Sequence, residues 1–432
     1  MCPSCPPFHD ARKMAGNSYL LLHYANLLPL CNRRFYSIIW VMSDNSVLYT
    51  AFDVVPSPKG ASTHITYFVK GLVEAGYEVQ LITAGDPTLP AEDTYHGARL
   101  KRVISAETNF LRRAMSFSEA VTGHLADGHG YAVAHFRSIW SGYPLVQARE
   151  QHGYRTLFEV NGLPSIELKY HYPALRGAPV LNKIRHQEVA TLHLADYIVC
   201  PSRVTREYIT SLGIPSERVT VIPNGVNTAL FSPCPAPPDE VPLLLYIGTL
   251  AGWQGLDTLL EAIPLVLAER PARLKIVGKG RKEQRKALQK RIRKMGLSEW
   301  VSLEGSASHD TIPQIINQAH LCLAPLAFND RNVTQGCCPI KVLEYLACGK
   351  PLVAANLPVV RELVCDGQEA LLFTPDDPAD LARCILTLLN DPSLAGRLAE
   401  AGCRRVHREF TWEIAQQKLL GVYERLLAPA SN

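Results

Sequence analysis

The 432-residue sequence contains no apolar run long enough to cross a bilayer. The apolar stretch from Tyr19 to Leu30 has only about a dozen residues, whereas a transmembrane helix needs roughly 20. No clear small-residue cleavage site follows it, so a signal peptide is a weak interpretation. The scattered cysteines fit a reducing compartment, so we expect a cytoplasmic protein that at most touches the inner face of the cytoplasmic membrane.

The 12 cysteines follow no disulfide or metal-ligand pattern. Cys2 and Cys5 have the spacing of a zinc pair, but no second pair and no nearby histidines accompany them. The chain also has no Gly-x-Gly-x-x-Gly after its first predicted strand. These absences exclude a disulfide scaffold and argue against a metal site at Cys2 and Cys5. They also weigh against a dinucleotide-binding oxidoreductase.

Charge is sparse as well, with 19% charged residues and a net charge of +4. A balance this modest implies no nucleic-acid partner. The composition is 47% hydrophobic, which is ordinary for a soluble globular protein. Because the chain is too long for one compact core, we expect two domains.

From residue 46 onward, short apolar strands alternate with helical stretches, which predicts parallel sheets of βαβ units. The expected fold is α/β, with two doubly wound domains and a ligand crevice at the strand ends. Residues 1–41 lack this pattern, and we expect the functional start at or near Met42. The predicted division is an extension of doubtful role at 1–41, an N-terminal domain at 42–222, a proline-rich linker at 223–242, a second domain at 243–408 and a returning C-terminal helix at 409–432.

The most informative segment runs from Gly336 to Pro351. It predicts a small-residue loop, a helix opened by Pro339, a stop at Gly349 and a following strand. The N-terminus of such a helix offers free N–H groups and a positive dipole end to an anion. Lys341 lies in the first turn, and Glu344 lies three residues later on nearly the same face. A cation and a carboxylate together suit a ligand with phosphates at one end and sugar hydroxyls at the other, which describes a nucleotide sugar.

This segment resembles the donor-site motif of glycosyltransferase family 4, the retaining enzymes with the GT-B fold of two Rossmann-like domains facing a central cleft. The family motif has two glutamates separated by seven residues; here the second is Glu344, and Gly336 stands at the first. The pattern Pro-x-Lys-x-x-Glu-Tyr-x-Ala-x-Gly-Lys-Pro is similar to a branch in which the lysine is typical. The resemblance implies donor contacts for Gly336, Cys338, Ile340 and Glu344 and a catalytic role for Lys341.

Motifs in the first half carry the same resemblance. The segment Lys59-Gly60-Ala61-Ser62-Thr63-His64 resembles the family's first loop, which implies that Gly60 binds the donor and that His64 is catalytic. The segments 195–202, 219–227 and 231–233 occur in the family's order and are its most specific signature in the chain.

Asn161 follows a predicted strand where relatives often have a histidine near the reacting sugar, and we assign it to the catalytic group. Its amide can bond sugar hydroxyls but is neither acid nor base at ordinary pH. His64, His135, His171 and Glu159 are alternatives for such a role, although a lone residue of this kind is more often structural.

The second half carries further donor loops. The resemblance implies that Gly248, Thr249 and Gln254 meet the diphosphate, although many relatives have arginine at 249 and lysine at 254. Charge developing on the departing nucleotide still needs stabilisation, which we expect from Lys341, the helix N-terminus and either Arg331 or Lys279. The remaining donor residues that the resemblance implies are Gly278, Lys279 and Ser306.

Two basic segments leave alternatives open. The run from Lys279 to Lys294 reads either as a solvated amphipathic helix or as a contact for anionic lipid or a polyanionic acceptor. The segment from Phe110 to Met115 is the better candidate for contact with a membrane.

The expected function is transfer of a hexose from a UDP- or GDP-linked sugar to an acceptor hydroxyl in polysaccharide, glycolipid or glycoconjugate synthesis. The resemblance implies retention of configuration, no cofactor and no metal, and the lack of any Asp-x-Asp tripeptide agrees with the last. The acceptor is expected to be a sugar, lipid-linked or small molecule. A non-catalytic sugar-nucleotide-binding relative and another GT-B enzyme, such as a nucleotide-sugar epimerase, are the alternatives.

Overall fold

The computed structural model describes residues 45–57, 59–234 and 241–428. The extension expected at 1–41 and part of the linker lie outside this range. Within the described residues, no helix is both long and apolar enough to cross a membrane.

The first sheet has eight strands in the order β3-β4-β2-β1-β5-β6-β7-β8. All neighbours are parallel except β3 and β4. The strands are β1 (Ser46–Val54), β2 (Glu78–Ala84), β3 (Glu92–Tyr95), β4 (Ala98–Val103), β5 (Val133–Phe136), β6 (Arg155–Glu159), β7 (Tyr197–Cys200) and β8 (Val219–Val221).

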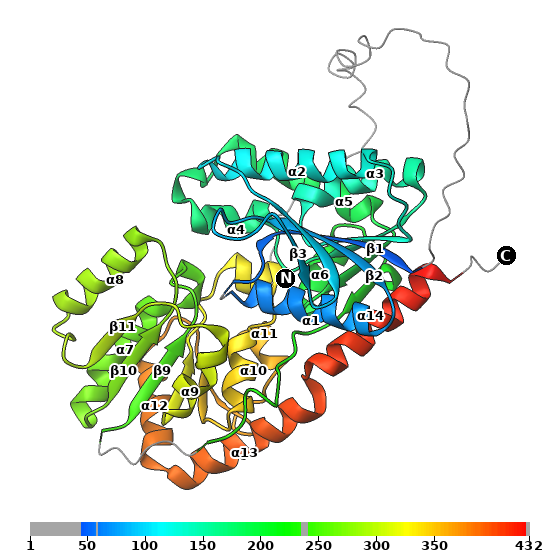
Figure 1. Ribbon diagram of the computed structural model, residues 1–432. Coiled ribbons are helices and arrows are strands. Elements are labelled where there is room, and N and C mark those ends of the chain that lie inside the picture. The colour runs from blue at the N-terminus through cyan, green and yellow to red at the C-terminus, as the bar shows by residue number, and fades with distance from the viewer. Residues whose placement is uncertain (1–44, 58, 235–240, 429–432) are drawn as a thin grey trace, which may run out of the picture. The chain divides into compact units, whose positions relative to one another are not determined.

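Helices cover both faces of this sheet, which explains why β1 is almost continuously apolar. Val47, Tyr49 and Ala51 of β1 point to one core, and Leu48 points to another. The first core is closed by α1 (Gly60–Glu74) and α14 (Trp412–Leu427). The second is closed by α2 (Phe110–Ala126), α3 (Ile139–His152), α4 (Pro164–His171), α5 (Pro179–Leu194) and α6 (Arg203–Ser211), as the upper part of Figure 1 shows for α2, α3 and α5.

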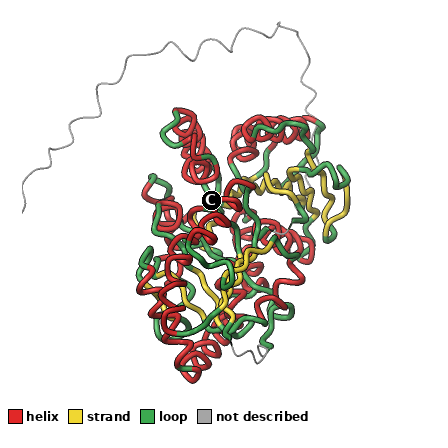
Figure 2. Tube along the Cα trace, turned by 90° about the vertical axis from the view of Figure 1, so that its left-hand side faces the viewer, coloured by secondary structure: helices red, strands yellow, loops and turns green. Residues whose placement is uncertain are grey.

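The second sheet has six parallel strands in the order β11-β10-β9-β12-β13-β14. Its strands are β9 (Leu243–Ile247), β10 (Arg273–Val277), β11 (Val301–Glu304), β12 (Leu321–Ala324), β13 (Leu352–Ala355) and β14 (Leu371–Phe373). Its helices are α7 (Leu256–Glu269), α8 (Lys282–Lys294), α9 (Ile312–Asn317), α10 (Ile340–Ala347), α11 (Pro358–Arg361), α12 (Pro378–Asn390) and α13 (Pro392–Glu409). The strands form two separate groups bordered by helices (Figure 2), so the prediction of two doubly wound α/β sheets is confirmed.

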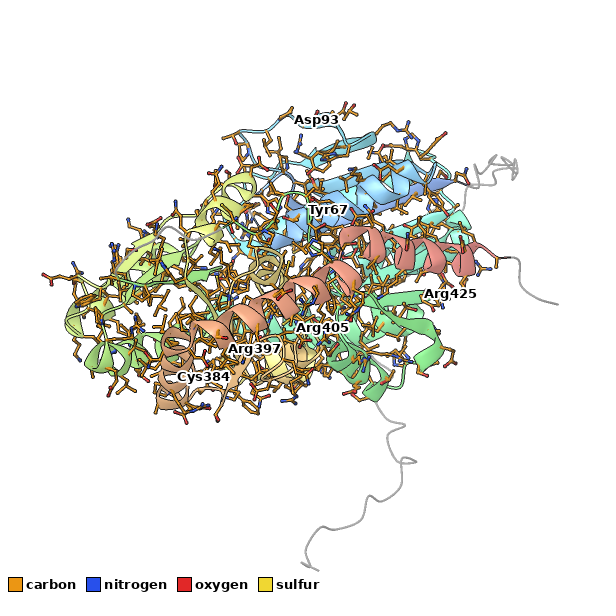
Figure 3. All side chains as sticks on the ribbon, turned by 90° about the horizontal axis from the view of Figure 1, so that it is seen from below. Tyr67, Asp93, Cys384, Arg397, Arg405 and Arg425 are labelled. Atoms are coloured by element: carbon orange, nitrogen blue, oxygen red, sulfur yellow. The ribbon has the colours of Figure 1, made fainter. Side chains whose placement is uncertain are left out.

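The chain passes twice between the two sheets, and the two passages touch. Val226 N donates to Phe410 O at 2.9 Å, and Val226 forms a parallel bridge with Thr411. At this contact the chain leaves α13, which packs in the core of the second sheet, and enters α14, which packs in the core of the first. Figure 3 shows these two helices end to end, with Arg405 on α13 and Arg425 on α14.

One strand of the first sheet does not fit the predicted pattern of short apolar strands alternating with helices. The short strand β3 is polar and pairs antiparallel with β4 at the sheet edge, so it has no apolar run to reveal it. Its turn to β4 uses His96 and Gly97, both with positive φ, of 49° and 86°. Two consecutive residues with positive φ are typical of a tight hairpin turn. The pair His96-Gly97 is the sequence feature that could have indicated this hairpin.

The contact between the two passages leads to a stability prediction. A Cβ at Gly225 would lie 2.5 Å from Trp412 N and 2.6 Å from the Thr411 carbonyl carbon, and backbone cannot rotate away as a side chain can. We expect Gly225→Ala to lower the free energy of unfolding by about 1–3 kcal/mol, the usual scale of overpacking, measured by chemical denaturation.

Gly421 is the matched control, because it lies within α14 and a Cβ there would meet nothing within 4 Å. Gly421→Ala should raise stability by about 0.5–1 kcal/mol through helix propensity. Equal stability of wild type and Gly225→Ala would show that the two passages separate freely.

Candidate active site

The switch points of the two sheets lie between β1 and β5 and between β9 and β12. The loop after β1 leads into α1 at Gly60, and this loop meets the start of α10. A Cβ added at Gly60 would lie 3.2 Å from Ile340 Cδ1. The first glycine loop and the predicted donor helix are therefore in contact, although 280 positions of sequence separate them.

Helix α10 begins at Ile340, with Pro339 at its N-cap, and ends at Ala347. The predicted opening is thus correct to within one residue, and Gly349 follows the end with a φ of 61°. Val342, Tyr345 and Leu346 are fully buried, because this face of the helix packs on the second sheet. Lys341 and Glu344 lie on the partly exposed face at the positive end of the helix dipole.

The ammonium of Lys341 reaches the loop that follows β9. Its Nζ donates to Gln254 Oε1 at 2.6 Å and lies 4.1 Å from the centre of the Tyr246 ring. A Cβ at Gly248 would lie 2.5 Å from the same nitrogen, so only a glycine leaves it room. Burial lowers the pKa of Lys341 to about 7, while the nearby Glu344 acts in the opposite direction.

Two glycine loops pack directly on each other beside Lys341. A Cβ at Gly278 would lie 1.7 Å from Gly248 O, and Leu250 N donates to Lys279 O at 3.0 Å. Tyr246 donates its hydroxyl to Thr249 O at 2.7 Å, which holds the first loop. The structure therefore brings together Gly248, Thr249, Gln254, Gly278, Lys279 and Lys341.

Glu344 carries a carboxylate with no hydrogen bond described within residues 45–57, 59–234 and 241–428. Burial raises its pKa to about 7, and the charge of Lys341 only partly offsets that rise. Its oxygens are available to hydroxyl donors of a ligand, and a group poised between its two charge states is typical of functional sites.

A second cluster surrounds Glu159 at the end of β6, and its carboxylate is only 2% exposed. Tyr49 donates to Oε2 at 2.6 Å, and Arg137 Nε donates to Oε1 at 2.7 Å. Asn161 also donates its amide to Oε1. Burial favours the protonated acid, but Arg137 and the neighbouring histidines outweigh it and hold the pKa of Glu159 well below its usual range.

Two histidines complete this cluster. His64 Nε2 lies 2.8 Å from Glu159 Oε1, and His135 Nε2 lies 3.2 Å from Oε2. Burial lowers the pKa of His135 despite the carboxylate beside it, so this ring is neutral at ordinary pH. On its other side, His64 Nδ1 lies 2.6 Å from Asn224 Oδ1.

Gly336 stands where the family motif has its first glutamate, and the structure accounts for the glycine. Its φ of 80° favours glycine. A Cβ there would lie 2.7 Å from both Ser202 Oγ and Thr205 Oγ1. The hydroxyls at the start of α6 fill the space that a larger side chain would need.

Helix α4 of the first half contacts the segment that precedes α10 in the second half. Its Glu167 accepts hydrogen bonds from Arg331 Nε at 3.2 Å and Gln335 Nε2 at 3.0 Å. The ring of His171 packs against Trp253 at 4.9 Å. Arg331 is therefore already paired across the site, and of the two alternatives for extra charge, Lys279 is the exposed one.

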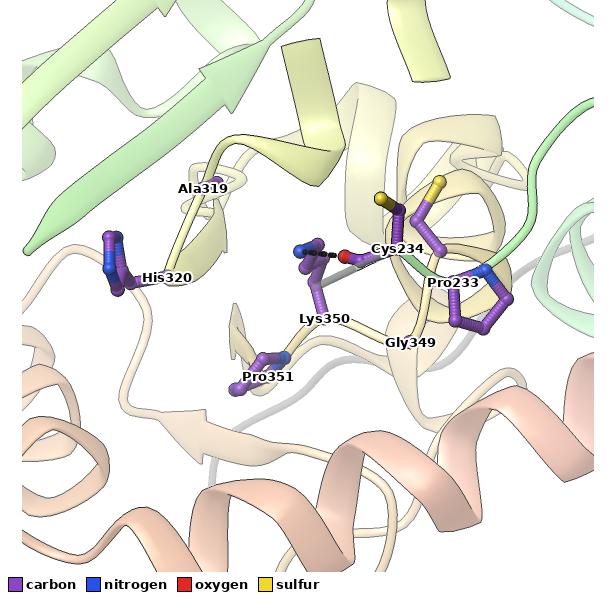
Figure 4. Close-up of a pocket in the computed structure, with 8 residues that line it drawn as sticks. Pro233, Cys234, Ala319, His320, Gly349, Lys350 and Pro351 are labelled. Carbon is purple, nitrogen blue, oxygen red and sulfur yellow. Dashed lines mark hydrogen bonds between the residues drawn. The ribbon is translucent and has the colours of Figure 1, made fainter. Parts of the chain in front are cut away.

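Ser306 lies in an exposed loop after β11, and within the described residues no hydrogen bond joins its side chain to the other predicted site residues. A separate pocket lies at the opposite end of α10 (Figure 4). There the buried Lys350 donates to Cys234 O at 2.9 Å and Asn317 O at 2.8 Å, so this lysine ties loops together. Sequence reasoning missed Tyr49, Arg137 and Asn224, of which Arg137 carried a signal as a polar residue directly after a buried strand.

Comparison with known proteins decides what this site belongs to. A family model described as Glycosyltransferase Family 4 matches residues 58–230, and one described as Glycosyl transferases group 1 matches residues 241–391. The chain belongs to glycosyltransferase family 4. This family 4 enzyme is therefore a glycosyltransferase that uses a nucleotide sugar.

Relatives and solved structures agree with this assignment. The glycosyltransferase is 26% identical over 400 residues to the D-inositol 3-phosphate glycosyltransferase of Thermobispora bispora, covering 85% of this chain and 90% of that one. Sucrose-phosphate synthase from Thermosynechococcus elongatus matches with a TM-score of 0.74 at 22% identity, over 88% of this chain and 98% of that one. HepE of Anabaena, solved with UDP and glucose, matches with a TM-score of 0.69 at 17% identity, over 88% and 99%. These likenesses confirm the GT-B fold.

The charges beside the donor helix lead to a prediction of pH dependence. An anionic diphosphate favours protonated Lys341, whose pKa is about 7 in the free protein, and is disfavoured by ionised Glu344. Affinity for UDP-glucose should therefore be highest below pH 7 and fall as the pH rises, by at most about tenfold per pH unit for each proton taken up. The diphosphate of UDP-glucose is a diester and does not itself titrate here.

Calorimetry from pH 6 to 8.5, in buffers with different ionisation enthalpies, measures both the affinity and the proton uptake. Lys341→Arg is the matched variant, because a guanidinium stays charged throughout, and it should flatten the lysine's share of the dependence. A wild-type affinity that stays constant over this range would contradict the prediction.

Proposed function

We propose that this glycosyltransferase moves a hexose from a UDP- or GDP-linked sugar to an acceptor hydroxyl, with retention of configuration and without a bound metal or cofactor. The observation that carries the proposal is the position of the Lys341 amine. It extends from the start of α10 to Gly248 and Gln254. The HepE structure, a fold neighbour that holds UDP, supports a uridine nucleotide.

The donor would lie along the second domain, which we assign to 243–408. Its diphosphate would sit at the N-terminus of α10 beside Lys341, and its ribose hydroxyls would meet the carboxylate of Glu344. The base would lie near the loop of Ser306. The two packed glycine loops at Gly248 and Gly278 would allow backbone to approach the phosphates closely.

The acceptor would lie along the first domain, which we assign to 42–222, with 223–242 as linker and 409–432 as the returning helix. Asn161, just after β6, would face the acceptor, with the buried His64 of α1 behind it and Gly60 at the start of α1 turned toward the donor. Asn161 would orient a sugar hydroxyl, because its amide offers both a donor and an acceptor. His171, which packs on Trp253, would lie at the boundary between the two halves.

In this mechanism the leaving phosphate takes the proton of the acceptor hydroxyl as the new glycosidic bond forms on the same face. The protein supplies position and charge instead of a nucleophile. Protonated Lys341 stabilises the negative charge that grows on the departing nucleotide. Thr249 and Gln254 contribute hydrogen bonds but no charge, so Lys341 carries most of this task.

Peripheral membrane contact would involve the start of α2. Arg112, Arg113 and Met115 are exposed there, with the Met115 side chain 62% exposed. Cations beside an exposed apolar side chain suit an anionic lipid surface.

The test is turnover of UDP-, GDP- and ADP-hexoses, with nucleotide release measured with and without acceptors and the product anomer assigned by proton NMR. Lys341→Ala removes a contact that strengthens in the transition state, so kcat should fall by the equivalent of about 2.7–4 kcal/mol while KM changes less. Glu344→Ala should weaken the binding of every donor, and Glu344→Gln should be milder.

Lys418→Ala is the matched control, because this lysine is exposed on α14. Its kinetics should equal those of wild type. A Lys341→Ala enzyme within about twofold of wild type, a difference of only ~0.4 kcal/mol, would show that the phosphates bind elsewhere. Turnover of no donor by the wild type would favour a non-catalytic role.

A further inference from the structure

The side chain of Asn224 joins one residue from each half of the enzyme. Its Oδ1 lies 2.6 Å from His64 Nδ1, and its Nδ2 donates to Cys338 O at 2.7 Å. His64 belongs to α1 in the first half, and Cys338 lies two residues before the start of α10 in the second. Asn224 itself is on the passage between the halves and is only 8% exposed.

The two contacts assign the amide orientation without ambiguity. A carbonyl oxygen can only accept, so the group facing Cys338 O must be the NH₂ of Asn224. The oxygen of the amide then faces His64, and His64 Nδ1 must carry a proton to donate to it. The remaining ring nitrogen, Nε2, faces the carboxylate of Glu159 at 2.8 Å.

The bridge is held rigidly at both ends. The neighbouring Gly225 packs against the backbone of Thr411 and Trp412, which fixes the main chain of Asn224. The His64 ring packs against Phe68 at 4.0 Å and meets Trp412 edge-on at 5.5 Å. Both side chains are buried, with His64 3% and Asn224 8% exposed, and close packing of this kind restricts their rotamers.

We propose that Asn224 is a positioning residue that sets the donor loop, residues 336–339, and His64 in register, so that the two act as one unit in transfer. The proposal rests on the proposed function of this site. Hydrogen bonds join Cys338 O to Asn224 and Asn224 to His64. The His64 ring then lies 2.8 Å from the carboxylate of Glu159, which accepts from Asn161 on the acceptor side. A shift of the donor loop thereby reaches the group that orients the acceptor.

Kinetics of single and double variants test this role. Asn224→Ala should lower kcat by about 10- to 100-fold, the cost of a small misplacement, while KM for the donor stays within about threefold. His64→Ala should lower kcat as well. Because Asn224 acts through His64, the double variant should be no slower than the slower single variant. If the kcat loss of the double variant equals the product of the two single losses, Asn224 does not act through His64. That result overturns the proposal.

Asn227→Ala is the matched control. Asn227 lies three residues further along the same passage, and its side chain accepts from Ala229 N at 3.1 Å within its own turn. It should leave kcat unchanged. Asn224→Asp keeps an acceptor for His64 but turns an oxygen toward Cys338 O, so it should raise the KM for the donor more than Asn224→Ala does. No difference between the Asp and Ala variants would count against the bridge.

A second readout does not depend on turnover. In protein labelled with ¹⁵N-histidine, adding UDP or GDP should shift the ring signals of His64 in the wild type, since the donor loop reaches His64 through Asn224. The shift should be lost in Asn224→Ala and kept in Asn227→Ala. A wild-type His64 signal that neither nucleotide moves, or one that moves equally in Asn224→Ala, overturns the inference. Failure of every donor to turn over would overturn the proposed function and leave this measurement decisive.

Discussion

The buried carboxylate of Glu159 organises the edge of the first sheet that faces the second. A carboxylate this deeply buried costs several kcal/mol unless it is fully paired, so Tyr49, Arg137 and His64 are held around it. Arg137 also donates to Ala61 O at 3.0 Å, which fixes the first glycine loop. Through His64 and Asn224 the same charge reaches the donor loop. One ionised group thus sets the position of elements from both halves.

The donor side solves a different electrostatic problem. Thr249 and Gln254 carry no charge, yet the diphosphate of the proposed donor needs positive charge. The chain places Lys341 on α10 so that its amine reaches Gln254 and the Tyr246 ring. The cation therefore comes from a helix that also offers its positive dipole end. With a pKa of about 7, Lys341 is neutral in part of the molecules at neutral pH, so the free protein carries less buried positive charge.

Much of the fold followed from local pattern. In the second sheet β9, β12, β13 and β14 are apolar runs, so local pattern indicates these strands and their alternation with helices. The start of α10 and its stop at Gly349 followed from proline and glycine at its two ends. In contrast, β3 is polar and depends on pairing with β4, and the close packing of Gly336 on Ser202 and Thr205 joins residues far apart in the chain. No local pattern carries such contacts.

The sequence by itself determined two doubly wound domains, the family and the helix that carries Lys341 and Glu344, because periodicity and motif spacing are properties of neighbouring residues. Only the tertiary structure decided how the polar groups pair. It turned Glu159, an isolated glutamate at a strand end, into the centre of a five-residue cluster of Tyr49, His64, His135, Arg137 and Asn161. It also turned the asparagine of a Pro-Asn-Gly turn into a bridge between His64 and Cys338, because hydrogen bonds between distant segments exist only once both sheets have placed their loops.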